Sequence, residues 1–186
     1  MEKYKYCPIC GGKLVNGFMD GLDRSGCKQC AWINYLNPIP VVAGIVLNKK
    51  KEILLVKRKV APSVGCWALP GGFIELNETP AKAGRRELFE ETGVKAKSGR
   101  LIGAELQKSR MYGYVLVVGM EFTAKSTKPV PGDDAMDAKY IPIEKLPKIP
   151  FKSHCLLIDA YLKLQKRTNP KKYQSKKHQP RRLFAT

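Results

Sequence analysis

The sequence lacks a long hydrophobic run. No apolar stretch reaches the roughly 18–20 residues that a helix needs to cross a bilayer. The first ten residues, MEKYKYCPIC, also lack the apolar segment of a signal peptide. From these two absences we expect no membrane association and a cytoplasmic location.

Acidic residues are scarce as well. The chain has 16 Asp and Glu against 34 Lys and Arg, a formal net charge of +18. Residues 165–186 hold eight basic groups and no acidic one, and the rest of the chain is also basic. This balance favours polyanionic partners: nucleotide diphosphates, RNA or nucleic acid bound non-specifically. We predict a basic, disordered tail over residues 167–186, which either adds solubility and non-specific nucleic acid affinity or holds RNA.

Four of the six cysteines form two pairs, Cys7 with Cys10 and Cys27 with Cys30, in the pattern C-x2-C-x16-C-x2-C. This spacing is typical of a tetrahedral zinc site built from two knuckles. Disulfides are the alternative, but they require an oxidising compartment that nothing else in the sequence indicates. We therefore predict a small zinc ribbon over residues 1–36, stabilised largely by its metal.

The 186-residue length and the 44% hydrophobic content suit one ordinary domain beside this ribbon, and we place it at residues 37–166. Apolar and β-branched runs predict strands, and the first two are expected to pair as a hairpin. The expected strands are 41–47, 52–58, 67–70, 100–107, 112–123 and 139–141. A helical turn at 143–146 and a helix at 153–166 should follow a loop at 125–137. Strands around a central helix predict an α/β fold with a mixed sheet.

The central helix has clear start and stop signals. Thr79 is the expected N-cap, Pro80 the first helical residue, and Gly93 the residue just beyond the end. Within the helix Glu87, Glu90 and Glu91 have i, i+3, i+4 spacing, so their carboxylates share one face. Like charges at this spacing repel, which favours a bound cation such as a hard divalent ion. A solvated acidic face with ordinary caps is the plainer alternative.

The stretch from Gly72 to Val94 resembles the Nudix box. It reads Gly72, five residues, Glu78, seven residues, Arg86-Glu87-Leu88, one residue, Glu90-Glu91, one residue, Gly93-Val94. The resemblance implies a Nudix α/β/α sandwich and hydrolysis of a nucleoside diphosphate linked to another moiety X.

The same resemblance implies roles for individual residues. Glu87, Glu90, Glu91 and the Gly71 carbonyl are the expected ligands of Mg²⁺ (or Mn²⁺), and Glu87 is a possible water-activating base. Arg86 and Glu78 are expected to orient these carboxylates through ion pairs.

Substrate choice lies outside the box. Asp133, Asp134 and Asp137 in the expected loop are either catalytic or ordinary turn residues. Arg58 either meets a phosphate or is an exposed charge at a strand end. Trp67 either stacks on a base or packs in the core. Tyr112, Tyr114 and His154 are weaker candidates for substrate contacts.

Ribbon and box together, with the segments VVAGIVL and GCWALPGGFIELNETP, resemble the zinc-ribbon Nudix hydrolases, a group with ADP-ribose, FAD and NADH pyrophosphatases. The NADH type carries a downstream SQPWPFPxS signature, for which this chain offers only IPFKS at 149–153. We expect a dinucleotide-type diphosphate as the substrate, AMP as a product and, from the resemblance alone, a possible homodimer. The alternatives are an RNA 5′-end hydrolase (cap or NAD-cap) and a non-catalytic Nudix binding protein.

Overall fold

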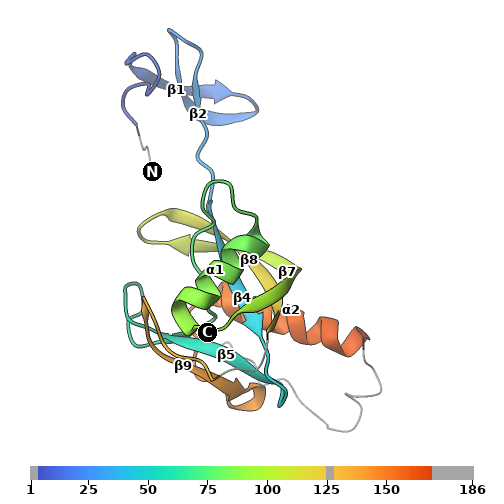
Figure 1. Ribbon diagram of the computed structural model, residues 1–186. Coiled ribbons are helices and arrows are strands. Elements are labelled where there is room, and N and C mark those ends of the chain that lie inside the picture. The colour runs from blue at the N-terminus through green and yellow to red at the C-terminus, as the bar shows by residue number, and fades with distance from the viewer. Residues whose placement is uncertain (1–3, 125–127, 169–186) are drawn as a thin grey trace. The chain divides into compact units, whose positions relative to one another are not determined.

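The computed structural model describes residues 4–124 and 128–168, so most of the predicted tail and part of the 125–137 loop lie outside the described residues. The chain divides between Pro38 and Ile39 into two compact units (Figure 1). We refer to residues 4–38 as the ribbon unit and to the described residues from 39 onward as the Nudix unit, after the segment 72–94 that resembles the Nudix box.

The ribbon unit holds an antiparallel sheet of order β1-β2-β3. Its strands are β1 (Leu14–Met19), β2 (Leu22–Cys27) and β3 (Ile33–Asn34). The β1–β2 turn is Asp20-Gly21, and both residues have positive φ, 49° and 79°, as two-residue hairpin turns require. Among the described side chains of this unit, only Cys7, Cys27 and Asn34 are buried. The unit therefore has almost no apolar core.

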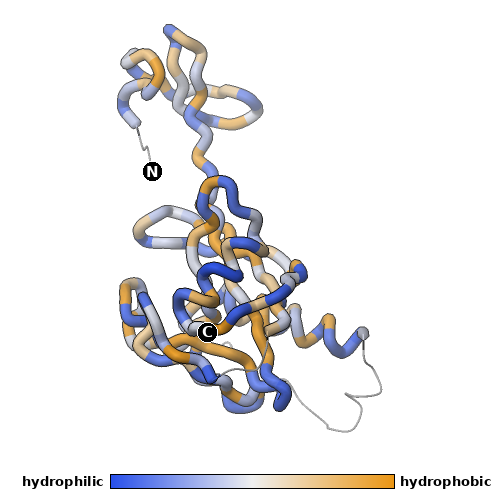
Figure 2. The backbone as a smooth tube through the Cα atoms, viewed as in Figure 1, coloured by the Kyte–Doolittle hydropathy of each residue, from blue (hydrophilic) through white to orange (hydrophobic). Residues whose placement is uncertain are grey.

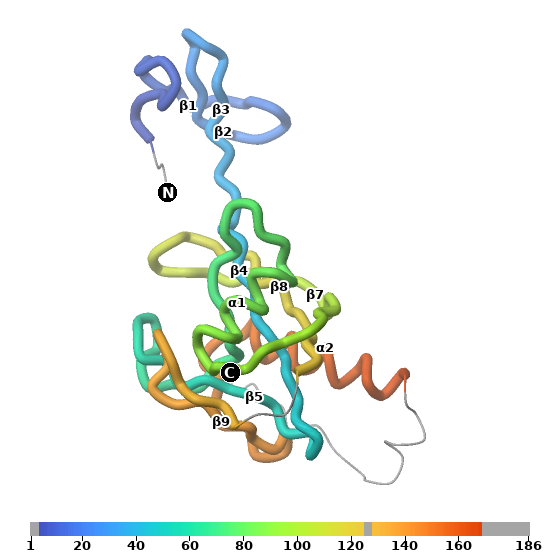
Figure 3. The backbone as a smooth tube through the Cα atoms, in the orientation of Figure 1, coloured from blue at the N-terminus to red at the C-terminus, as the bar shows by residue number. Residues whose placement is uncertain are grey.

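The Nudix unit contains two three-stranded sheets. The first has the order β4-β8-β7, with β4 (Ile39–Val46), β8 (Gly113–Ala124) and β7 (Ala96–Ser109). It is mixed, because β4 and β8 run parallel while β7 and β8 are antiparallel. The second is antiparallel, with the order β6-β5-β9 and the strands β6 (Trp67–Ala68), β5 (Glu52–Arg58) and β9 (Ala135–Pro142) (Figure 3).

Two expectations about these strands were wrong. β4 and β5 do not pair as a hairpin: they lie in different sheets and share one isolated bridge, Leu47 to Ile53. The apolar pattern of β4 indicates a buried strand but does not determine which strand pairs with it. The strand that pairs with it in parallel, β8, lies much later in the sequence. Asp137 lies within β9, opposite Lys57, and not in the preceding loop.

Two helices cover opposite sides of the strands, as Figure 1 shows. They are α1 (Pro80–Thr92) and α2 (Lys152–Thr168), and a short 3₁₀ turn, η1 (Ile143–Lys145), precedes α2. α1 coincides with the predicted helix, and α2 runs two residues beyond the predicted end at 166.

Strand residues alternate between the two helices. Val42, Val46 and Leu54 pack in one buried cluster with residues of α1. Ala43, Ile45, Ile53 and Leu55 pack in a second cluster with residues of α2. Because both faces are covered, the strands are hydrophobic along much of their length, as the orange colour of β5 in Figure 2 shows. The predicted α/β/α sandwich is confirmed.

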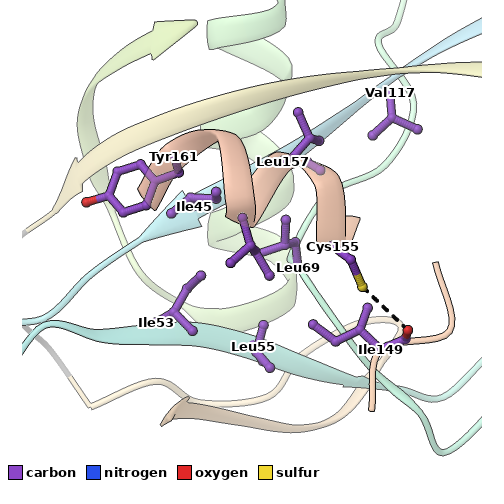
Figure 4. Packing of buried hydrophobic residues seen from close by; sticks show 11 residues of the cluster. Ile45, Ile53, Leu55, Leu69, Val117, Ile149, Cys155, Leu157 and Tyr161 are labelled. Atoms are coloured by element: carbon purple, nitrogen blue, oxygen red, sulfur yellow. Dashed lines mark hydrogen bonds between the residues drawn. The ribbon is translucent and has the colours of Figure 1, made fainter. Parts of the chain in front are cut away.

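The α2 side of the core is drawn in Figure 4. Leu157 and Tyr161 of the helix lie in the same buried cluster as Ile45, and Figure 4 shows Tyr161 beside Ile45. A Cβ on Gly119 of β8 would overlap the Leu157 side chain, so the glycine allows Leu157 to pack closely against this strand. No helix in the described part of the chain is long and apolar enough to cross a membrane.

Candidate active site and cysteine cluster

The helix α1 is fixed at both ends by the residues that the sequence indicated. The Thr79 hydroxyl accepts a hydrogen bond from the Lys82 amide at 3.2 Å, and Pro80 opens the helix. Gly93 has φ 65° and donates its N–H to the Phe89 carbonyl at 2.8 Å. Both caps satisfy backbone groups that a helix end leaves unpaired.

The turn before α1 brings backbone against the carboxylates. A Cβ on Gly71, which has φ 152°, would lie 2.0 Å from the Val42 carbonyl oxygen. A Cβ on Gly72 would lie 2.5 Å from Glu87 Oε1. Real Cβ contacts are essentially never this short, so Gly71 has no room for a side chain against the backbone, and a side chain at Gly72 would displace the Glu87 carboxylate. The two glycines therefore allow the close approach of the turn to the acidic face of the helix.

Glu91 is the most buried carboxylate of the site, with 6% of its surface exposed. Its Oε2 accepts the Gly71 N–H at 2.8 Å. Burial, together with the negative charges of Glu87 and Asp134, raises the pKa of Glu91 to about 8. Burial also raises the pKa of Glu87, against the opposing effect of Arg86. Both carboxylates therefore lie in a poorly solvated place, which disfavours their negative charge.

Arg86 neutralises part of this charge. Its guanidinium makes two hydrogen bonds to Glu78, at 3.0 and 2.8 Å, and bonds of 2.7 Å to Glu87, 3.1 Å to Glu90 and 3.0 Å to the Phe73 carbonyl. All five donors of the side chain are used. The hydrogen bonds from Arg86 lower the pKa of Glu78 to about 2. Arg86 thus ties the box turn to the acidic helix face.

The loop before β9 docks onto the end of α1. The Val130 N–H donates to the Thr92 carbonyl at 2.9 Å, and the Gly132 N–H donates to the Glu91 carbonyl at 3.1 Å. Asp133 and Asp134 follow directly, and their charges contribute to the raised pKa values of Glu87 and Glu91. The fold brings these two aspartates to the acidic cluster.

Asp137, in contrast, is engaged elsewhere. Its carboxylate pairs with Lys139 at 2.5 Å, and this contact lowers its pKa. Lys139 also lies 5.8 Å from the centroid of the Trp67 ring. Trp67 itself packs against the α2 side of the core.

Arg58 braces the loop that follows β5. Its Nε donates to the Pro62 carbonyl at 2.8 Å, and its terminal nitrogen donates to the Ala61 carbonyl at 3.2 Å. The guanidinium lies 5.5 Å from the Phe151 ring centroid, and its charge acts on Glu91 and on His154. Arg58 is therefore near the acidic cluster, with its donors already directed at the loop.

Phe73 and His154 connect the site to more distant segments. The Phe73 ring meets Tyr112 edge to face, with the centroids 5.4 Å apart, while Tyr114 is exposed. His154 Nδ1 accepts the Leu69 N–H at 3.1 Å. Neither link has a sequence signal, because each joins residues from separate parts of the chain.

The four paired cysteines form a second cluster, in the ribbon unit. Their sulfur atoms all lie within 4.8 Å of one another, with Cys7 to Cys30 at 3.5 Å and Cys10 to Cys27 at 3.4 Å. A tetrahedral ion with metal–sulfur bonds of about 2.3 Å needs sulfurs about 3.8 Å apart. The Cys30 backbone N–H lowers the pKa of Cys27 to about 7, whereas the neighbouring thiols raise the pKa of Cys30 to about 12 against the hydrogen bond from the Trp32 backbone.

All six cysteines are free, so the disulfide alternative is not realised. Cys155 is buried and its thiol is directed at the Ile149 carbonyl (Figure 4), whereas Cys66 is half-buried. The four ribbon cysteines lie close enough together to hold one metal ion.

The fold and the acidic face of α1 together indicate a phosphohydrolase, and comparison with known proteins supports this class of protein. The NUDIX domain family matches residues 37–157. The chain therefore belongs to the Nudix family, and the expectation of a Nudix hydrolase is confirmed.

Individual relatives extend this assignment. An ADP-ribose pyrophosphatase of Methanocaldococcus jannaschii is 38% identical over 130 residues, which cover 69% of this chain and 76% of that protein. The NAD-capped RNA hydrolase NudC of Haemophilus influenzae is 32% identical over 120 residues, 62% of this chain but only 44% of its own length. The crystal structure of a NUDIX hydrolase from Nitrosomonas europaea, 26% identical, superposes with a TM-score of 0.68 over 89% of this chain and 93% of that one.

Proposed function

We propose that this protein is a magnesium-dependent pyrophosphohydrolase that cleaves a nucleoside diphosphate linked to X. ADP-ribose is the leading candidate substrate, and FAD and NADH are the alternatives. The observation that carries this proposal is the acidic face of α1, held against the Gly71-Gly72 turn. The relative named ADP-ribose pyrophosphatase, 38% identical to this chain, supports the choice of substrate.

The donor set fits a hard divalent cation. Glu87, Glu90, Glu91 and the Gly71 carbonyl offer only oxygen ligands, which Mg²⁺ and Mn²⁺ prefer. In the described residues, Arg86 engages Glu87 and Glu90, and the Gly71 amide engages Glu91. Each of these hydrogen bonds uses one carboxylate oxygen, so the second oxygen of Glu87, Glu90 and Glu91 is available to a cation. When bound, such an ion neutralises diphosphate charge and lowers the pKa of a bound water.

The chain's own residues have three further tasks in this proposal. Glu87 accepts a proton from the attacking water, with Asp133 or Asp134 on the docked loop as the alternative base. Arg86 and Glu78 form a bidentate ion pair that fixes the positions of the neighbouring carboxylates. Arg58 and Trp67 are the proposed substrate contacts beyond the box, whereas Asp137 is a weaker one because of its pairing with Lys139.

In the ribbon unit we propose a structural Zn²⁺ on Cys7, Cys10, Cys27 and Cys30, because four thiolates in a tetrahedral cluster suit this ion. We also propose a cytoplasmic location for a protein with such reduced cysteines. A homodimer remains a proposal from the resemblance alone.

The test is a hydrolysis screen of the purified full chain with Mg²⁺ against ADP-ribose, FAD, NADH, NAD-capped RNA and nucleoside triphosphates, with products separated by chromatography. Selective release of AMP from ADP-ribose is the expected result. Absence of turnover on every substrate, from protein that binds both metals, would favour the non-catalytic binding alternative.

A second candidate is hydrolysis at RNA 5′ ends. It rests on the 32% identity to NudC and on the net charge of +18. It predicts RNA binding that weakens steeply with salt and falls when residues 167–186 are deleted. Preference for ADP-ribose over NAD-capped RNA in the same screen would decide against it.

A further inference from the structure

His154 joins the last helix to the segment that leads into the box. It lies in the first turn of α2, and its Nδ1 accepts the Leu69 N–H at 3.1 Å across 85 positions of sequence. Leu69 is 2% exposed, so its amide has little access to water. A buried N–H without an acceptor is costly, and His154 supplies the acceptor.

The segment that His154 contacts is held at three consecutive residues. The Leu69 N–H donates to His154, the Pro70 carbonyl accepts the Gly44 N–H at 2.8 Å, and the Gly71 N–H donates to Glu91 at 2.8 Å. Planar peptides and the fixed φ of proline leave few torsions between Leu69 and Gly71. A shift at the Leu69 amide is therefore transmitted to the Gly71 peptide.

The imidazole is itself held in place. Its ring packs against Phe151 with centroids 5.0 Å apart, and Phe151 in turn lies beneath the Arg58 guanidinium. Burial, and then the charge of Arg58, lowers the pKa of His154 to about 4. The ring is neutral at ordinary pH, so Nδ1 is free to accept and Nε2 carries the proton.

We propose that His154 is a positioning residue for the proposed Mg²⁺ site on the acidic face of α1. By fixing the Leu69 amide, it sets the position of the Gly71 peptide opposite Glu91. This inference rests on the proposed function, because its effect on turnover is measured in that reaction. The competing interpretation is a core histidine whose hydrogen bond serves stability alone.

Three substitutions separate the two interpretations. His154→Leu removes the acceptor and keeps an apolar side chain. His154→Asn keeps an acceptor close to the position of Nδ1, whereas His154→Gln places its oxygen near the position of Nε2. We expect kcat to fall by about tenfold or more in the Leu variant, since small displacements of reacting groups are costly. Asn should restore most of the loss, Gln should not, and KM should change little in all three.

Two readouts are independent of turnover. Calorimetric titration of Mn²⁺ should give weaker binding in the Leu and Gln variants than in wild type and in the Asn variant. Amide hydrogen exchange at Leu69 and Gly71 should accelerate in the same two variants. Leu157→Ala is the matched control: it removes packing from the same helix, so it should lower the unfolding midpoint without changing kcat or Mn²⁺ affinity.

The proposal is overturned if the Leu and Gln variants keep wild-type kcat and Mn²⁺ affinity, or if Asn and Gln behave alike. If the Leu variant does not fold, the Asn and Gln pair decides. If wild-type protein hydrolyses no diphosphate, the proposed function fails by itself, and Mn²⁺ binding and amide exchange still test the role of His154.

Discussion

The ribbon unit and the Nudix unit are stabilised in different ways. In the ribbon unit, large apolar side chains such as Ile9 and Phe18 are 70% and 77% exposed, and the buried side chains are two cysteines and an asparagine. In the Nudix unit, Ile45, Ile53, Leu55 and Leu88 are at most 1% exposed and lie in two clusters between helices and strands. The folding stability of a short segment without an apolar core depends on a cross-link such as a bound metal. The folding stability of a larger unit depends on the burial of apolar side chains.

Removal of the Zn²⁺ proposed for the ribbon unit should have the largest effect. A structural zinc site contributes on the order of 10 kcal/mol to folding. Chelation, or Cys27→Ser, should therefore unfold the ribbon unit while the Nudix unit keeps its fold. Near-ultraviolet circular dichroism and amide exchange, measured on the full chain, would report each unit. Loss of both units together would contradict the distinction drawn between them.

The next largest effect should be on catalysis alone. Glu91→Gln removes a proposed cation ligand, and we expect kcat to fall about 10³-fold because several kcal/mol of transition-state stabilisation are lost. The fold should survive, since a neutral amide suits a buried position at least as well as a carboxylate. Steady-state kinetics and thermal unfolding would test both points. Glu105→Gln on β7 is the control, and a Glu91→Gln enzyme with normal turnover would refute the assignment of the site.

Core truncation should act on the Nudix unit only. Leu157 is 1% exposed and packs under the strands, so Leu157→Ala should cost about 2–5 kcal/mol of unfolding free energy. Denaturant titration followed by tryptophan fluorescence would measure this loss in a Trp32→Phe background, which leaves Trp67 as the remaining tryptophan. The metal content of the ribbon unit should be unchanged. A parallel loss of bound zinc would mean that the two units are thermodynamically coupled.

The stability of the Nudix unit should also depend on His154 in acid. Its pKa is lowered to about 4 in the folded protein, below the value of about 6.5 in an unfolded chain. The resulting stability is present above pH 6.5 and is lost as the pH falls toward 4. In thermal unfolding, His154→Asn should lose less stability than wild type over this interval. Identical pH profiles would refute the assigned pKa shift.

The smallest effect expected is at the helix N-terminus. Thr79→Ala removes the side-chain acceptor of the Lys82 amide and should cost about 1 kcal/mol. Thr79→Ser keeps the acceptor and should cost much less. Chemical denaturation of the three proteins would compare them, and an alanine variant as stable as wild type would show that the cap contributes nothing.

Much of the Nudix unit was predictable because its signals are local. The caps Thr79 and Gly93 act within one helical turn, and the spacing of Glu87, Glu90 and Glu91 places them on one face whatever surrounds them. The cysteine pairs likewise need only short turns. Two expectations failed, the β4–β5 hairpin and the loop position of Asp137, because each depended on strand pairing.

The sequence by itself determined the box helix, its acidic face, the cysteine cluster and the alternation of buried residues, since each follows from backbone periodicity over a few residues. Tertiary structure decided that β4 joins β8, that Asp133 and Asp134 reach the acidic cluster, and that His154 meets Leu69. These contacts join residues far apart in the chain, and their geometry is set by how the packed layers fit together, which no local pattern encodes.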